Sequence, residues 1–362
     1  MRVYFIGCIL LVSCWLVPYS LFAQEEERFA DMVKRYQQTS DARNIAGLEN
    51  ALRAAHVRTE ELIDALPKDA ARIMRIREIK EVFANVIHFM GKVKNAKRDS
   101  LQGVLERLYP GFDLDDPDME LLPQKMMVEL IEDYFKVYNV EQMNVNKYSY
   151  VLFNVKSEKV RNAYVLPFVR SAFEQRGYGK KLAEVCEDVC WCSKTPETVK
   201  EVEALVEQYR PLQAGAAAPE FVMENRKGES VKLSDFKGKH VFIGVFPAEM
   251  NENETMSQFV ALPDEYNNTD RFVYLCVCLG KADVRDAWRK LVGDKAGKVD
   301  FLFCDVERCS FVRDYCISRV PRYVFVNQDG SLRDAWHIAP GTSEFSYQFG
   351  DKAPSDLFDV LK

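Results

Sequence analysis

The spacing of apolar residues changes once along this chain, and that change most constrains its fold. Up to about Tyr209, apolar side chains recur at three- and four-residue steps, which is the spacing of one helix face. After a stretch of small residues and proline, residues 211–219, short continuous apolar runs take over. Such runs, separated by helical patterns, are typical of strands in a sheet covered on both faces. The sequence therefore predicts an all-α domain over 24–210 and an α/β domain over 211–362.

Individual elements follow from the same patterns. The late helices of the first part are predicted over 156–176, 180–191 and 196–209. Pro167 is expected to kink or split the first of them, because proline removes a backbone donor. Four strands are predicted in the second part, over 240–246, 272–279, 299–303 and 323–326. The tight turn at 327–330 predicts a hairpin from the fourth strand into the residues after it.

The N-terminal residues have the composition of an export signal. Residues 3–23 carry no charge, and the stretch ends in a small residue, Ala23. We expect a secretory signal peptide over 1–23, and hence a protein of the periplasm or cell envelope. Two alternatives stay open, an uncleaved anchor helix or a lipoprotein with Cys14 lipidated. A membrane is an expected partner only in those two cases.

Charge and cysteine content exclude some functions. The 49 basic and 55 acidic residues give a net charge of −6, whereas a general nucleic-acid binder normally carries a basic face. Ten cysteines in 362 residues are too few for a small disulfide scaffold. We expect no nucleic acid, no metal and no cofactor, and a protein or peptide as the partner.

Four segments of the α/β part share one family pattern. They are Ala218–Phe221, Val231–Lys239, Tyr315–Pro321 and Arg322–Gly330. In this order and spacing they resemble the TlpA-like thioredoxin family of exported bacterial proteins. The resemblance implies a thioredoxin-like fold for 211–362, and a cis peptide bond between Val320 and Pro321. A cis bond is a minority state even before proline, so this expectation is specific.

The catalytic turn of that family is degenerate in this chain. Aligned from Val241, the two active cysteines of the family fall on Met250 and Asn253, and its preceding tryptophan falls on Glu249. In the family's chemistry a thiolate at a helix N-terminus attacks, and a second thiol resolves the mixed disulfide. Neither methionine nor asparagine performs either step. We therefore expect dithiol chemistry to be lost at this turn.

The resemblance also implies a peptide-binding surface that needs no thiol. In this fold the residue before the cis-proline offers its backbone to an extended peptide beside the active-site turn. The expected groove residues are Phe246, Glu249, Met250, Asn253, Val320, Pro321 and Arg322. For Arg322 two interpretations stay open, a binding site for an acidic group or a solvated charge at a strand edge.

Cysteines outside the turn have competing interpretations. Cys276 and Cys278 alternate along one predicted strand, so both face the same side of the sheet. Core packing is the plain interpretation, and Cys278 acting as a relocated reactive thiol is the sharper one. A disulfide between Cys304 and Cys309, at the end of the third predicted strand, is a further possibility.

Three further cysteines, Cys186, Cys190 and Cys192, lie within a span of seven residues at the end of the helix predicted over 180–191. A zinc site, a disulfide and buried thiols are all open here, although no fourth metal ligand is close in sequence. The four histidines are scattered and share no nucleophile motif, so structural or surface roles are expected for them.

Three functions are compatible with these features. The first is a non-catalytic binding or scaffold protein that uses the groove or the helical domain to hold a protein or peptide. The second is a thiol-disulfide oxidoreductase that uses a relocated cysteine, Cys278. The third is a purely structural envelope protein. Whether the chain is an enzyme is left open at this stage.

Overall fold

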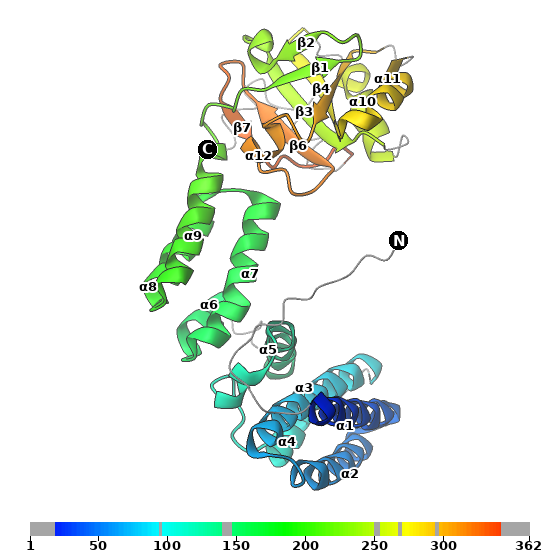
Figure 1. The fold of residues 1–362 in the computed structure, drawn as a ribbon, viewed down its shortest axis with the longest axis vertical. Helices are drawn as coiled ribbons and strands as arrows, with labels where there is room; N and C mark the ends of the chain where they lie inside the picture. The colour runs from blue at the N-terminus through cyan, green and yellow to red at the C-terminus, as the bar shows by residue number, and fades with distance from the viewer. Residues whose placement is uncertain are drawn as a thin grey trace. The chain divides into compact units, whose positions relative to one another are not determined.

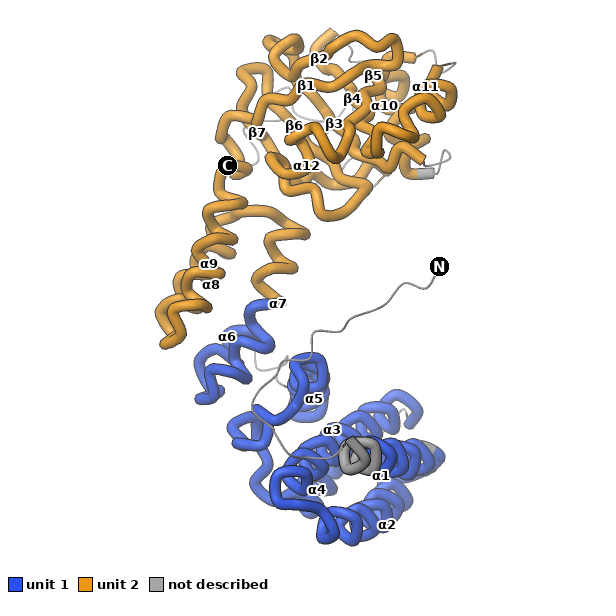
Figure 2. Tube along the Cα trace, viewed as in Figure 1, with its two compact units in different colours: residues 1–166 blue, residues 167–362 orange. Residues whose placement is uncertain are grey.

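The computed structural model describes residues 19–93, 96–139, 147–249, 254–266, 270–293 and 297–341. The chain divides into two compact units, residues 1–166 and residues 167–362 (Figure 2). The division falls at Pro167, inside the helix α7 (Glu158–Arg176). Two helices before residue 210 thus group with the sheet, and the predicted domain boundary at 210/211 stays a prediction.

The regular secondary structure described in unit 1 is all helical. Its helices are α1 (Tyr19–Gln38), α2 (Ile45–Ile63), α3 (Lys68–Lys92), α4 (Arg98–Leu108), α5 (Gln124–Tyr138), α6 (Lys147–Asn154) and the first half of α7, with short 3₁₀ turns at Thr39–Asp41 and Pro117–Leu121. The sequence explains the start of α2, where the Asn44 side chain accepts a hydrogen bond from the Gly47 backbone N–H. Leu48, Leu52 and Ala55 then line one buried face of that helix.

The helices predicted at the end of the all-α part are present. They are α7, α8 (Lys180–Cys192) and α9 (Pro196–Tyr209). Pro196 occupies the first helical position of α9, where its missing N–H has no intrahelical partner to lose. Of the two expectations for Pro167, the split is wrong, because α7 runs through this residue as one helix, and the kink stays a prediction.

Unit 2 contains a seven-stranded mixed sheet in the order β2-β1-β5-β4-β3-β6-β7 (Figure 1). The strands are β1 (Val222–Asn225), β2 (Ser230–Lys232), β3 (His240–Pro247), β4 (Phe272–Gly280), β5 (Val299–Asp305), β6 (Arg322–Val326) and β7 (Leu332–Asp334). Strands β3, β4 and β5 run parallel, while β6 is antiparallel to β3. The four predicted strands and the hairpin are confirmed, and so is the thioredoxin-like α/β fold after an all-α region.

Both faces of the sheet are buried at its central strands, β3 to β6. One face packs against the helices α10 (Glu254–Tyr266) and α11 (Arg285–Gly293) through a largely aromatic cluster that includes Phe242, Phe259 and Trp288. The alternate residues of the same strands, among them Ile243 and Leu275, are also fully buried. Continuous apolar runs are therefore what this sheet requires. A short helix, α12 (Phe311–Asp314), precedes β6.

Most of the predicted signal peptide lies outside the described residues. The structure describes only its last five residues, which form the beginning of α1. Among the described residues, no helix has the length and apolar character to cross a membrane. Cleavage after Ala23 and lipidation of Cys14 stay predictions.

Candidate functional site

The carboxyl ends of three parallel strands meet at one edge of the sheet. The ladders pair Phe246 with Cys278, and Cys278 with Phe303, so β3, β4 and β5 end side by side. Between the end of β3 and the start of α10 lies the turn at which the family carries its cysteines. Met250 and Asn253 fall outside the described residues.

The proline expected beside this turn has the predicted geometry. The Val320–Pro321 bond is cis, which confirms the expectation. Strand β6 pairs with β3 up to the contact between Val245 and Arg322, so Pro321 lies next to the end of β3. Val320 is 36% exposed, and Pro321 and Glu249 are exposed as well. These three residues are accessible as the groove prediction requires.

Phe246 was predicted to line the groove, and that placement is wrong. Its side chain is fully buried and packs edge-on against the rings of Phe259 and Tyr323. Strand alternation is the cause, because Phe246 shares a face with Phe242 in the core under α10.

Arg322 is buried, so its interpretation as a solvated strand-edge charge is also wrong. It is 7% exposed, and its Nε donates a hydrogen bond of 2.7 Å to the Ala335 carbonyl. Its guanidinium lies 3.7 Å from the centroid of the Trp336 ring, a cation–π contact. Burial lowers the pKa of Arg322 to about 10. With these partners Arg322 holds the end of the hairpin and does not present its charge at the surface.

Trp336 fastens this hairpin to the preceding helices within unit 2, a role that sequence reasoning missed. Its indole N–H donates to the Glu174 carbonyl of α7 at 3.0 Å, and its ring lies 5.7 Å from that of Tyr209 in α9. Gly177 has a φ of +68°, and a Cβ there would meet the Trp336 ring at 2.2 Å. The glycine directly after α7 was the one available signal, since such a residue commonly ends a helix.

The cysteines of β4 are core residues. Cys276 is fully buried and Cys278 is 1% exposed, and both belong to the aromatic cluster under α10 and α11. Core packing is therefore confirmed for both. A relocated reactive thiol must be reached by its substrate, and the Cys278 sulfur has no such access.

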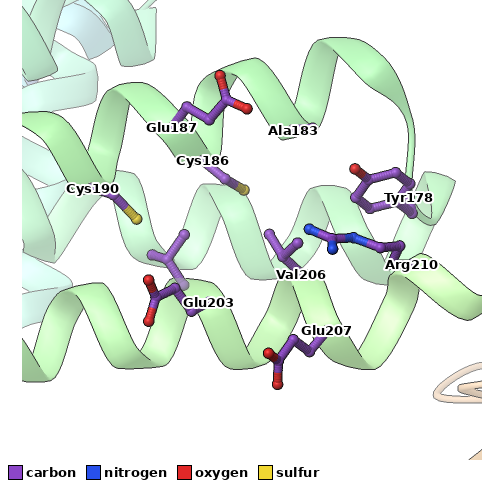
Figure 3. A pocket seen from close by; sticks show the side chains of 10 residues that line it. Tyr178, Ala183, Cys186, Glu187, Cys190, Glu203, Val206, Glu207 and Arg210 are labelled. Atoms are coloured by element: carbon purple, nitrogen blue, oxygen red, sulfur yellow. The ribbon is translucent and has the colours of Figure 1, made fainter.

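A second pair of cysteines lines a pocket between α8 and α9 (Figure 3). The pocket has a volume of about 430 Å³, and its wall includes Cys186, Cys190, Glu203 and Arg210. Burial raises the pKa of Cys186 to about 12 and also raises that of Cys190. Metal ligation and disulfide exchange both need the thiolate, so these thiols are poorly prepared for either.

One group of side chains in unit 1 has the composition of a metal site. His56, Glu60 and Glu78 bring their ligand atoms within 4.8 Å of one another. Glu78 is fully buried, and its Oε1 accepts a hydrogen bond from the Tyr36 hydroxyl. The same oxygen lies 3.1 Å from His56 Nδ1. Glu60 is paired with Arg75 at 3.3 Å. The group therefore forms a hydrogen-bonded network that joins the helices of unit 1.

The match to a family model agrees with the fold. The sheet order and the cis-proline are those of a thioredoxin-like domain. Residues 213–337, in the C-terminal part of this chain, match the Redoxin family model. The match leaves unit 1 and the helices up to α9 outside it. No curated protein matches the chain.

Solved structures of similar proteins are short relative to this chain. A protein named as a candidate thiol-disulfide oxidoreductase from Bacteroides vulgatus is 21% identical, over 38% of this chain and 96% of its own, with a TM-score of 0.34. The thioredoxin domain of a thiol-disulfide oxidoreductase from the same species is 23% identical, over 36% and 89%, with a TM-score of 0.29. A thiol-disulfide oxidoreductase from Bacteroides fragilis is 20% identical, over 32% and 86%, again with a TM-score of 0.29.

Proposed function

We propose that this chain is an exported, non-catalytic binding or scaffold protein that holds an extended polypeptide beside Pro321. One observation carries the proposal: Met250 and Asn253 stand where the family pattern has its two cysteines. A thioether does not exchange with disulfides, and a carboxamide does not resolve a mixed disulfide. In this proposal the domain keeps the peptide-binding surface beside Pro321 and lacks thiol-disulfide exchange at the turn after β3.

The backbone before β6 is the part of this surface best suited to a peptide. Within the described residues β6 is paired on both sides, by β3 and by β7, so a peptide cannot add along the strand itself. The exposed Val320 and Pro321 precede the paired segment. Main-chain pairing there gives affinity, and the exposed apolar Val320 adds a side-chain contact.

Export is supported by the uncharged N-terminal segment with a small residue at position 23. The mature chain should begin near Gln24 and be recovered in the periplasmic fraction. Recovery of the chain in membranes with a fatty acid on Cys14 would show a lipoprotein instead.

The second candidate function is thiol-disulfide exchange by a relocated cysteine, which the Redoxin match favours. The burial of Cys278 argues against that residue as the reactive thiol. Insulin disulfide reduction, followed by initial rate in wild type and in Cys278→Ser, separates the two functions. We expect wild type to stay at the background of ordinary thiols. Multiple turnovers by wild type, whichever cysteine they need, would overturn the non-catalytic proposal.

Binding needs its own test, with a probe that cannot exchange thiols. Reduced and carboxymethylated α-lactalbumin is an extended polypeptide of this kind, and its binding can be followed by fluorescence anisotropy. Val320→Asp should weaken binding about ten-fold or more, because it places a charge at the apolar contact. Val222→Asp is the matched control, since Val222 is an exposed valine on β1, and three strands lie between β1 and β6. Equal losses in both variants, or no binding by wild type, would contradict a groove beside Pro321.

A further inference from the structure

Two sulfur atoms lie together at the carboxyl end of β5. Cys304 is the last residue but one of this strand and is fully buried. A turn follows, closed by the Cys309 backbone N–H, which donates to the Asp305 carbonyl at 2.8 Å. The turn returns Cys309 to the strand end, where its side chain is within hydrogen-bonding distance of the Cys304 thiol. Both are free thiols in this structure.

The two thiols differ in access and in charge. Cys309 is partly exposed, whereas Cys304 lies behind it. The neighbouring Cys304 thiol and the Phe311 backbone N–H lower the pKa of Cys309, since a hydrogen bond to its sulfur favours the thiolate. The same thiol–thiol bond, together with burial, raises the pKa of Cys304. When the pair loses a proton, these opposite shifts favour its loss from the outer sulfur, Cys309.

Cys309 faces a surface hollow with room for a small molecule. The hollow has a volume of about 330 Å³, within the range of small-ligand pockets. Its charged lining includes Glu224, Asp305 and Arg285, and the last two are paired at 3.4 Å. Arg308 stands at the rim with its side chain 82% exposed. A disulfide compound in this hollow can reach Cys309, while Cys304 is left to act from behind.

We propose that Cys304 and Cys309 form a thiol–disulfide exchange site for a small-molecule disulfide. The Cys309 thiolate attacks one sulfur of the compound RS–SR, which forms a mixed disulfide and releases RS⁻. Cys304 then loses its proton to the released thiolate and attacks the Cys309 sulfur. The Cys304–Cys309 disulfide forms and the second RS⁻ leaves, taking a proton from water. The protein is oxidised by two electrons, and RS–SR is reduced to two thiols.

This site is separate from the groove beside Pro321 and goes beyond the proposed function. One chain is oxidised once by one equivalent of disulfide, so the exchange requires no catalytic turnover. Failure of peptide binding at Val320 leaves the sulfur pair untouched, and failure of the sulfur pair leaves the groove untouched.

Peptide mapping of the wild-type chain tests the proposal without any substitution. The chain is reduced, freed of reductant, incubated with oxidised glutathione, alkylated and digested with trypsin. Trypsin cuts after Arg308, so the two cysteines fall in different peptides, 299–308 and 309–313. We expect these peptides joined by one disulfide, and separated again by reductant. Both peptides recovered singly with alkylated cysteines, while other cysteines are oxidised, would overturn the proposal.

Single substitutions test the order of attack. Cys304→Ser should trap glutathione on peptide 309–313, because the resolving thiol is missing. Cys309→Ser should yield neither the joined peptides nor glutathione on Cys304. Cys278→Ser is the matched control, since that cysteine is buried on the adjacent strand, and it should give the wild-type map. Glutathione trapped equally on wild type and Cys304→Ser would exclude Cys304 as the resolving thiol.

Discussion

Strand β4 carries one pair of cysteines and the end of β5 with its following turn carries another, yet the two pairs are in opposite chemical situations. Cys276 and Cys278 lie on the pleat of β4 under two helices, surrounded by aromatic rings. Cys304 and Cys309 lie across a turn, one thiol buried and the other facing a hollow. Adjacent strands of one sheet thus give an inert pair and a polarised pair. Access and a hydrogen-bonding partner decide what a cysteine does here, more than the strand that carries it.

The largest expected effect, on the rate of disulfide reduction, comes from adding a third pair of cysteines, in the segment after β3. Met250→Cys combined with Asn253→Cys should raise the initial rate of insulin reduction on the order of ten-fold or more above wild type. The physical reason is that a dithiol then stands at the turn before α10, where the fold supports exchange. Met250→Ser with Asn253→Ser is the matched control. A double-cysteine variant no faster than this control would show that position in the fold is insufficient.

A native-state labelling experiment sharpens the contrast between β4 and β5. The lowered pKa of Cys309 means that its thiolate persists as the pH falls, whereas an ordinary thiol is almost wholly protonated at pH 6. Iodoacetamide at pH 6 should therefore modify peptide 309–313 about ten-fold faster than peptide 272–281, which holds both β4 cysteines. The difference should collapse in denaturant, and equal rates in the folded chain would contradict the comparison.

For the stability of the fold, we expect Cys278 to matter more than Cys309, the reverse of their expected reactivity. Cys278→Ser places a hydroxyl in the aromatic cluster and should lower the free energy of unfolding by about 1–3 kcal/mol. Cys309→Ser changes a partly exposed side chain and should cost less than about 0.5 kcal/mol. Urea unfolding followed by tryptophan fluorescence measures both. A larger loss of unfolding free energy for Cys309→Ser than for Cys278→Ser would contradict this expectation, because the turn after β5 would then contribute more to stability than the Cys278 site on β4.

The smallest effect concerns the rim of the hollow. Arg308→Glu should slow the reaction of Cys309 with an anionic aryl disulfide by about two- to three-fold at low salt, because an exposed charge steers an oppositely charged reagent. The neutral reagent 4,4′-dithiodipyridine should react at an unchanged rate. Equal slowing of both reagents would point to a distorted turn in place of a lost attraction.

Much of the α/β fold was accessible from sequence because its signals are local. Apolar runs bounded by turn residues located β3 to β6. The cis bond was implied by the family resemblance of the segment ending at Pro321, and it is confirmed. Errors arose where neighbours from elsewhere in the chain decide the outcome. Phe246 ends an apolar run, and the strand alone does not tell core from groove. For Arg322 the sequence left a solvated charge and a binding site for an acidic group open, because the indole that covers it is fourteen residues further along the chain.

The candidate sites show the same limit. The short spacing between Cys304 and Cys309 suggested a bridge, but the hollow depends on β1 and α11, which contribute Glu224 and Arg285 from distant segments. The network around Glu78 was missed, since it joins Tyr36, His56 and Glu78 from three helices. Such long-range groupings follow from tertiary packing, for which a single sequence carries no spacing rule.

The contact of Trp336 with α7 and α9 has a practical consequence for dissecting this protein. A fragment cut at residue 211, where the composition changes, would lose the Glu174 carbonyl and the Tyr209 ring. The Trp336 indole, which contacts the buried Arg322 guanidinium, would then be exposed to solvent where these two residues had covered it. Such a fragment should be poorly soluble, whereas a fragment that begins before Pro167 retains both residues that contact the Trp336 indole. The smallest well-behaved piece of the protein is thus longer than its thioredoxin-like sheet.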